Sequence, residues 1–136
     1  VVALEKVKGG VGRAYAQVIE HASAKDFKPF FNDHISKDAS VVTDKWRGYM
    51  PLKKQYPNLK QIPSNGGTNF PDLHFHIMNL KGWLRGIHHH CSKERLQGYL
   101  DEYHFRYNRR NHMGAIFHLL IKKMVEYDPK RLQSIN

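Results

Sequence analysis

The sequence has a single cysteine, few acidic residues and no long apolar run. One cysteine, Cys91, among 136 residues excludes a framework of intrachain disulfides and is typical of a reducing cytoplasm. No stretch approaches the roughly 18 consecutive apolar residues of a transmembrane helix, so we expect no membrane span and no membrane partner. The start of the chain at Val1 has neither an initiator methionine nor the layout of a signal peptide.

The scarcity of acidic residues leaves the chain strongly basic. Lysine and arginine number 22 against 12 acidic residues, which gives a formal charge of +10 and a pI near 9.8. Such an excess favours a phosphate-rich partner, because cationic side chains displace counterions from a nucleic-acid backbone. The alternative is a soluble protein that is merely basic.

The length predicts one domain over residues 1–136 with a single core. Two apolar runs separated by Gly9 and Gly10 predict an antiparallel hairpin. The expected elements, in order, are strands over Val1–Lys8 and Gly12–His21, a helix from Ser23 to Ile35, a buried strand over Ser40–Asp44, a helix over Trp46–Tyr56, a strand over Leu59–Pro63, a loop over Ser64–Gly67, and helices over Leu73–Ile87, Ser92–Asn108 and Ala115–Tyr127. This order predicts an α/β layered fold with a helical C-terminal third.

The segment YLDEYHFRYNRRN, Tyr99 to Asn111, interleaves aromatic residues with cationic ones. We expect the aromatic face to pack inward and the arginines to contact a polyanion; the residues concerned are Tyr99, Tyr103, Phe105, Tyr107, His104, Arg106, Arg109 and Arg110. The alternative is a solvated helix end, whose cations complement the helix dipole.

A lone aspartate, Asp44, directly follows the β-branched run Ser40–Thr43 and opens the segment DKWRGY. A carboxylate at the end of a strand can bind a divalent metal, although the position alone favours an ordinary turn-capping aspartate.

Three segments together resemble bacterial insertion-sequence transposases of the DDE type. They are SVVTDKWRGY (Ser40–Tyr49), LKGWLRGIHHHCSKERLQGYLDEYHFRYNRRN (Leu80–Asn111) and the run AQVIEHASAKDFKPFF, and they occur in the family's order over nearly the whole chain. The most similar branch has an active site of two aspartates, an asparagine or glutamate, and a trailing lysine. The resemblance implies a ribonuclease H-like mixed sheet with flanking helices.

The resemblance also implies roles for individual residues. Asp44 matches the second catalytic aspartate and would bind metal, and Lys81 matches the trailing lysine. His74, seven residues before Lys81, stands where asparagine or glutamate is expected as a metal ligand, and a neutral imidazole brings less charge than a carboxylate. The two positions lie on one helix face. Two Mg²⁺ or Mn²⁺ ions are the implied cofactors.

The family's first aspartate lies in a D-E-x-x-x-G-G segment that would precede Val1. The chain is therefore expected to be an N-terminally truncated catalytic domain that lacks its first strand and is inactive alone. Glu5 is the only nearby acid that could substitute, and a solvent-facing strand residue is the simpler interpretation.

The ten histidines need a separate interpretation. A zinc site from His74, His76 and Cys91 is conceivable, but the spacing matches no standard finger, so a zinc enzyme ranks last. Within the resemblance, His89 and His90 belong to a turn near the active site and are expected to touch the DNA backbone.

The favoured function is thus metal-dependent cleavage and strand transfer of insertion-sequence DNA in the bacterial cytoplasm, on nucleoid DNA. The DNA contacts expected are Arg85, His89, His90, Arg106, Arg109 and Arg110, and the partners are element ends, target DNA and a second copy in a synaptic complex. The alternative is a non-catalytic DNA-binding module or a degenerate transposase remnant.

Overall fold

A computed structural model describes residues 1–87 and 92–112 of the chain. The elements in chain order are β1 (Val2–Val7), β2 (Gly10–Ala16), α1 (Ala24–His34), β3 (Val41–Thr43), the 3₁₀ helix η1 (Arg47–Lys54), β4 (Leu59–Gln61), the 3₁₀ turn η2 (Asn65–Gly67), α2 (Pro71–Ile87), α3 (Lys93–Tyr107) and the 3₁₀ turn η3 (Arg110–His112). The α/β class and the order of elements predicted from the sequence are confirmed. The expected helix over Ala115–Tyr127 lies outside the described residues.

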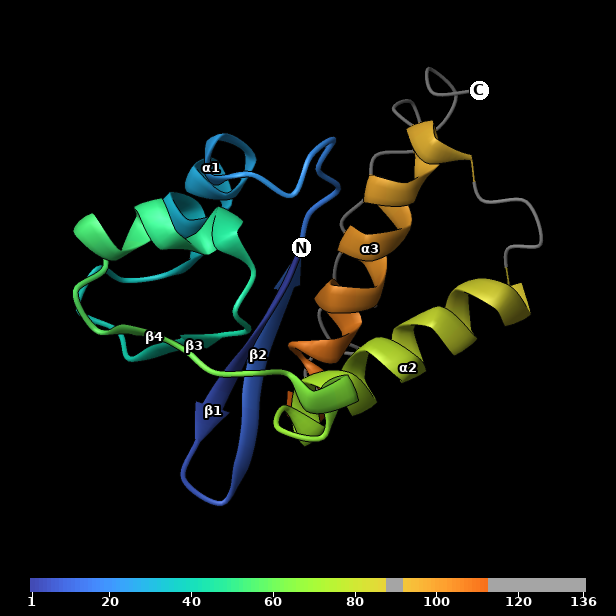
Figure 1. The fold of residues 1–136 in the computed structure, drawn as a ribbon. Helices are drawn as coiled ribbons and strands as arrows, with labels where there is room; N and C mark the ends of the chain where they lie inside the picture. Colours follow the sequence, from blue (N-terminus) through green and yellow to red (C-terminus); the bar gives the residue numbers. More distant parts are fainter. Residues whose placement is uncertain (88–91, 113–136) are drawn as a thin grey trace, which may run out of the picture.

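The strands form two small sheets (Figure 1). β1 and β2 make the predicted antiparallel hairpin, with Gly9 at φ +84° in its turn and an irregularity in register between Leu4 and Lys6. β3 and β4 pair in parallel, from Val41 opposite Leu59 to Thr43 opposite Gln61. Among the described residues no ladder joins the two pairs, so the single mixed sheet expected from the sequence is here two separate sheets.

One apolar core serves both sheets. Its buried centre comes from α1, η1, the segment after η1 and β4, and consists of Phe27, Phe30, Phe31, Leu52, Tyr56 and Leu59. Half-buried residues in or next to β1, β2 and β3 pack against the same cluster, among them Val1, Ala3, Tyr15 and Val41. The i, i+3, i+4 spacing of the three phenylalanines puts them on one face of α1, which explains why this helix covers both sheets.

Local details differ from the sequence-based expectation. β3 is not a buried strand, because Val42 is 48% exposed and points away from the core. The segment after it forms a 3₁₀ helix rather than an α-helix, with Pro51 inside it. Ser23 occupies the N-cap position of α1 as predicted, but its side chain makes no capping hydrogen bond. Instead the Asp26 carboxylate accepts a hydrogen bond from the His21 N–H at 2.7 Å.

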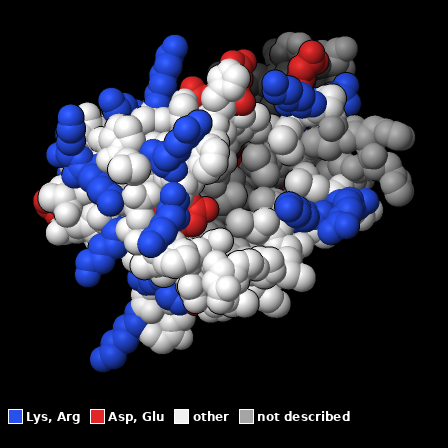
Figure 2. Space-filling view, in the orientation of Figure 1, with Lys and Arg blue, Asp and Glu red and all other residues white. Residues whose placement is uncertain are grey.

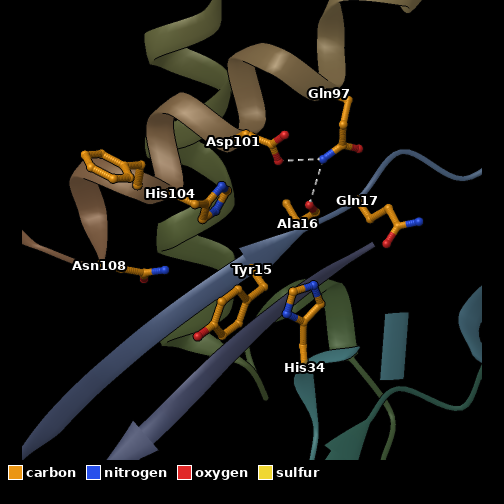
Figure 3. Close-up of a pocket in the computed structure, with 9 residues that line it drawn as sticks. Tyr15, Ala16, Gln17, His34, Gln97, Asp101, His104 and Asn108 are labelled. Atoms are coloured by element: carbon orange, nitrogen blue, oxygen red, sulfur yellow. Dashed lines mark hydrogen bonds between the residues drawn. The ribbon is translucent and has the colours of Figure 1, made fainter. Parts of the chain in front are cut away.

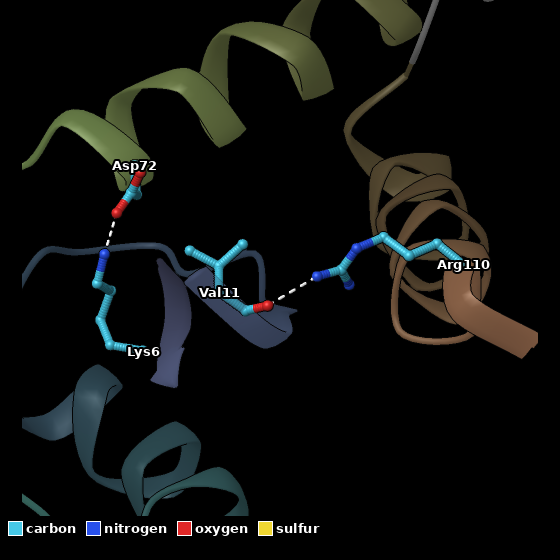
Figure 4. Close-up of polar contacts among 4 residues, drawn as sticks. All are labelled: Lys6, Val11, Asp72 and Arg110. Carbon is cyan, nitrogen blue, oxygen red and sulfur yellow. Dashed lines mark hydrogen bonds and ion pairs between the residues drawn. The ribbon is translucent and has the colours of Figure 1, made fainter. Parts of the chain in front are cut away.

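The hairpin is held between α2 and α3 (Figure 4). Lys6 of β1 forms an ion pair with Asp72 in the first turn of α2, and Arg110 just beyond α3 donates to the Val11 carbonyl of β2 at 2.8 Å. The ion pair is exposed, so its net contribution is about 0–1 kcal/mol. No described helix is long and apolar enough to cross a membrane.

Candidate functional site

Asp44 lies at the carboxyl end of β3, where the chain turns into η1. Its side chain is exposed, and its Oδ1 accepts a hydrogen bond from the Trp46 N–H at 2.9 Å. Gln61, the last residue of the neighbouring strand β4, donates from Nε2 to the carbonyls of Asp44 and Trp46, at 3.0 and 2.9 Å. The carboxylate therefore lies on a turn that is held by Gln61 of the parallel strand β4. Its Oδ2 has no hydrogen-bond partner in the described part of the chain.

Tyr49 follows Asp44 by five residues, and the charge of Asp44 affects its pKa. Its ring stacks on Phe27 with centroids 4.4 Å apart. Burial, and then the negative charge of Asp44, raise the pKa of Tyr49 to about 12. The phenol of Tyr49 therefore stays neutral at physiological pH.

The two other predicted site residues lie on α2. His74 is exposed in the first turns of the helix, where its ring rests against Gly67 of η2; a Cβ on Gly67 would lie 2.7 Å from the His74 Nδ1. Lys81 is exposed two turns further along, on the same face, and its carbonyl accepts from the Arg85 Nε at 3.4 Å. No hydrogen bond or ion pair joins Asp44 to either side chain within the described ranges. Nor do those residues contain a cluster of three or more His, Cys, Asp or Glu that could hold a metal.

His76 has a different environment from His74. It is buried against α3, with its Nε2 2.9 Å from the Nε2 of His104. The His104 Nδ1 lies 2.7 Å from the Leu100 carbonyl, which can only accept, so we assign the His104 hydrogen to Nδ1 and the shared hydrogen to His76 Nε2. Burial, then the charges of His104 and Arg110, lower the pKa of His76 to about 4. Burial also lowers the pKa of His104, so both rings are neutral near pH 7, and their contact joins α2 to α3.

The arginines of the Tyr99–Asn111 segment do three different things. Arg106 is exposed and pairs with Glu102 at 2.9 Å, one turn earlier. Arg109 is exposed and lies over the Phe105 ring, with its Cζ 3.7 Å from the centroid. Arg110 donates to the carbonyls of Gly12, Val11 and Tyr107 and covers the Tyr107 ring. Arg109 also donates to the Phe105 carbonyl at 3.1 Å. Arg106 and Arg109 are thus exposed and bonded only to residues of α3, whereas Arg110 is mainly engaged with β2.

The interpretation of this segment needs one correction. Phe105 was expected to pack inward with the tyrosines, but it is 52% exposed and carries Arg109 on its face. Tyr103 and Tyr107 do pack inward, both against His76. The predicted contacts His89 and His90, and also Cys91, lie outside the described residues.

Sequence reasoning missed the way in which α3 seals the open edge of β2. Asn108 accepts from the Ala14 N–H at 2.7 Å and donates to the Ala14 carbonyl at 2.9 Å, as a neighbouring strand would. Gln97 accepts from the Val18 N–H at 2.8 Å and donates to the Ala16 carbonyl at 3.2 Å. With Arg110 on Val11 and Gly12, these side chains occupy the β2 edge along its length, so the hairpin can add a further strand only at β1.

A cavity of about 360 Å³ lies between β2, the end of α1 and α3 (Figure 3). Tyr15 and His34 stack on one side of it with centroids 4.4 Å apart, and Asp101 and His104 lie on the other. Gln97 and Asn108 also line it, but their amides are already bonded to β2. Asp44 does not line this cavity, so the cavity and the strand end are separate places.

Basic side chains are spread over the molecule. Figure 2 shows lysine and arginine outnumbering acidic side chains on the viewed face, around α1 and η1, at the hairpin and along α2. On this face the basic side chains offer several places for phosphate contact rather than one compact patch, in keeping with the formal charge of +10.

Comparison with known proteins identifies a family for this chain. The family model for the ISXO2-like transposase domain matches residues 1–108, which covers the hairpin, Asp44, α2 and α3. Neither the curated proteins nor the solved structures give a significant match. Because the family match spans well over half of the chain, the insertion-sequence transposase resemblance is confirmed. The chain belongs to the ISXO2-like transposase domain family.

Proposed function

We propose that this chain is part of a catalytic domain that cleaves and rejoins insertion-sequence DNA with the help of divalent metal ions. The observation that carries the proposal is the position of Asp44, an exposed carboxylate on a braced turn at the end of a parallel strand, within a domain of the transposase family. Divalent ions of this kind prefer carboxylate oxygens, activate the attacking oxygen and stabilise the leaving one.

Asp44 is the primary ligand in this proposal. One carboxylate oxygen takes the Trp46 N–H, which fixes the group, and the other stays available for a metal. His74 is the second proposed ligand and Lys81, on the same face of α2, the proposed phosphate contact. Since the described residues gather no set of three ligands, a complete site for two Mg²⁺ or Mn²⁺ ions requires at least one further carboxylate.

The split sheet suggests where that carboxylate comes from. The β2 edge is sealed by α3, so the second edge of β1 is the open side of the hairpin. β1 and β3 both pack against the core formed by α1 and η1. A strand between β1 and β3 would join the two pairs into the mixed sheet of a ribonuclease H-like fold. We place the first catalytic aspartate on such a strand, which the described residues do not contain, and expect the 136-residue chain alone to be inactive.

The proposal for DNA binding rests on charge and on two exposed arginines. Arg109 lies on an exposed aromatic ring and uses one donor on the Phe105 carbonyl, and Arg106 has only an exposed, weak ion pair, so both keep donors for phosphate. Arg85 on α2 is a third proposed contact, and His89 and His90 stay predictions. These contacts would position DNA without reading sequence, so recognition of element ends and pairing of two copies in a synaptic complex need further surfaces.

The test is cleavage of element-end DNA by the complete transposase with Mg²⁺ or Mn²⁺. Asp44→Asn keeps the shape and the Trp46 hydrogen bond but removes the charge, and it should abolish cleavage while DNA binding persists. Asp33→Asn, an exposed aspartate on α1, is the matched control and should leave activity unchanged. Full cleavage by the Asp44→Asn protein would refute the catalytic assignment and favour a DNA-binding role alone.

A further inference from the structure

We infer that the exposed indole of Trp46 is a platform on which an unpaired nucleobase stacks beside Asp44. The inference rests on the proposed function and names a substrate feature that it requires: DNA that is locally unpaired at the Asp44 strand end. Four observations carry it, namely the exposure and tethering of the indole, the hydrogen bonds that hold the turn, the close approach at Gly48, and the position of Arg47.

The indole is both exposed and fixed. Trp46 is 46% exposed, although a tryptophan normally gains much of its stabilisation from burial. Its ring nitrogen donates to the Ala22 carbonyl at 2.6 Å, which ties one edge of the ring to the loop before α1. A tethered indole that is nearly half exposed suits a stacking platform, because little side-chain freedom is left to lose on binding.

The turn that carries Trp46 is the same one that orients the carboxylate. The Trp46 N–H is held by the Asp44 Oδ1, and Gln61 bonds to the carbonyls of both residues. The indole and the carboxylate are therefore held in a fixed relation, two residues apart. A base on the indole would place the adjoining phosphate close to Asp44.

Gly48 leaves room for this arrangement. A Cβ at Gly48 would lie 2.6 Å from the Ala22 carbonyl oxygen and 2.9 Å from the Trp46 Nε1, so any side chain would break the tether. The glycine is needed for close approach and not for its backbone angles. The W-R-G-Y segment thus contains the platform, a cation and the residue that lets the platform dock.

Arg47 supplies a phosphate contact next to the ring. Its guanidinium carbon is 6.0 Å from the Trp46 ring centre, at the outer limit of a cation–π contact, and the residue is exposed. Bases stack on aromatic faces with little sequence preference, and an adjacent arginine binds the backbone. Duplex DNA offers no free base face, so the platform should distinguish unpaired from paired DNA.

The experiment uses the fact that the chain has two tryptophans, Trp46 and Trp83. In the Trp83→Phe chain, the emission of Trp46 is followed while three DNAs are added: a single-stranded oligonucleotide, its perfect duplex, and the same duplex with three central mismatches. We expect strong quenching by the single strand and by the mismatched duplex, and little by the perfect duplex. In the unsubstituted chain, the same two DNAs should protect the exposed tryptophan from acrylamide.

Affinity gives the second readout. Trp46→Ala should weaken binding to unpaired DNA roughly 5- to 150-fold, the effect of losing one stacked base, and should leave duplex binding nearly unchanged. Trp46→Phe should retain most of the affinity. Met50→Ala is the matched control, because Met50 is 57% exposed in η1, the 3₁₀ helix that begins after Trp46, and has no proposed role.

The outcomes separate the inference from the proposed function. DNA binding without quenching, or equal quenching by paired and unpaired DNA, overturns the stacking platform and leaves the transposase proposal standing. Failure of the chain to bind any DNA in low salt overturns the platform and the DNA contacts proposed for Arg106 and Arg109, whereas the catalytic proposal is tested separately by cleavage with the complete transposase. Because quenching is measured with Trp46 in place, the result does not depend on whether the Trp46→Ala chain folds.

Discussion

Removing the Asn108 amide should lower the free energy of unfolding more than expected for a residue at the end of a helix. Asn108→Leu keeps a similar side-chain size but leaves the N–H and the C=O of Ala14 without partners, and Ala14 is fully buried. A buried unsatisfied polar group costs about 1–3 kcal/mol, so two should cost roughly 2–4 kcal/mol after partial relaxation. Against the 5–15 kcal/mol of a typical domain, that loss is about a third of the stability.

The assay is urea unfolding followed by far-UV circular dichroism, with the free energy of unfolding taken from midpoint and slope. Asn108→Asp tests the two bonds separately, because its carboxylate still accepts from the Ala14 N–H but faces the Ala14 carbonyl as a second acceptor. It should therefore also be destabilised at pH 7. Asn79→Leu, at an exposed position on α2, is the control. An Asn108→Leu midpoint equal to that of the unsubstituted protein would refute the edge-sealing role of α3.

Three further predictions follow from other contacts. Burial lowers the pKa of His76 from 6.5 to about 4, so on acidification the unfolded chain takes up a proton before the folded chain does. The free energy of unfolding should therefore fall by about 3 kcal/mol between pH 6.5 and pH 4. Urea midpoints measured against pH test this, and His76→Leu should flatten the slope. Gly48→Ala should cost roughly 1–3 kcal/mol through its clash with Ala22 and Trp46, whereas Gly82→Ala, with open space on α2, should stabilise by about 0.5–1 kcal/mol; thermal melts decide. Arg109→Ser should weaken DNA binding and reduce its salt dependence with unchanged stability, while Arg110→Ser should lower the melting temperature; equal behaviour of the two would contradict the division of roles.

The sequence predicts the elements well where the signal is local. Alternation on either side of Gly9 indicates the hairpin, and the spacing of Phe27, Phe30 and Phe31 indicates the buried face of α1. Capping and breaker residues locate α2 and α3 to within about two residues. These patterns depend on neighbours in the chain, so one sequence is enough to read them.

The contacts that organise the candidate site have no such signal. Asn108 reaches Ala14 across 94 positions and Gln61 reaches Asp44 across 17, and nothing nearby in the chain marks either partner. Arg110 illustrates the consequence: it has the composition expected of a DNA contact, but much of its hydrogen-bonding capacity is used by β2. Asp44 could be proposed from the sequence because its place at a strand end is a local property. The hydrogen bonds from Gln61 that hold its turn could not be predicted.

The most direct test of the central claim is a crystal structure of the complete catalytic domain with Mn²⁺, in which anomalous scattering locates the metal. We predict an ion within about 2.0–2.3 Å of an Asp44 carboxylate oxygen, and a strand between β1 and β3 that brings a second carboxylate to the same ion. Manganese bound elsewhere with Asp44 left free, or β1 and β3 paired directly to each other, would contradict the account.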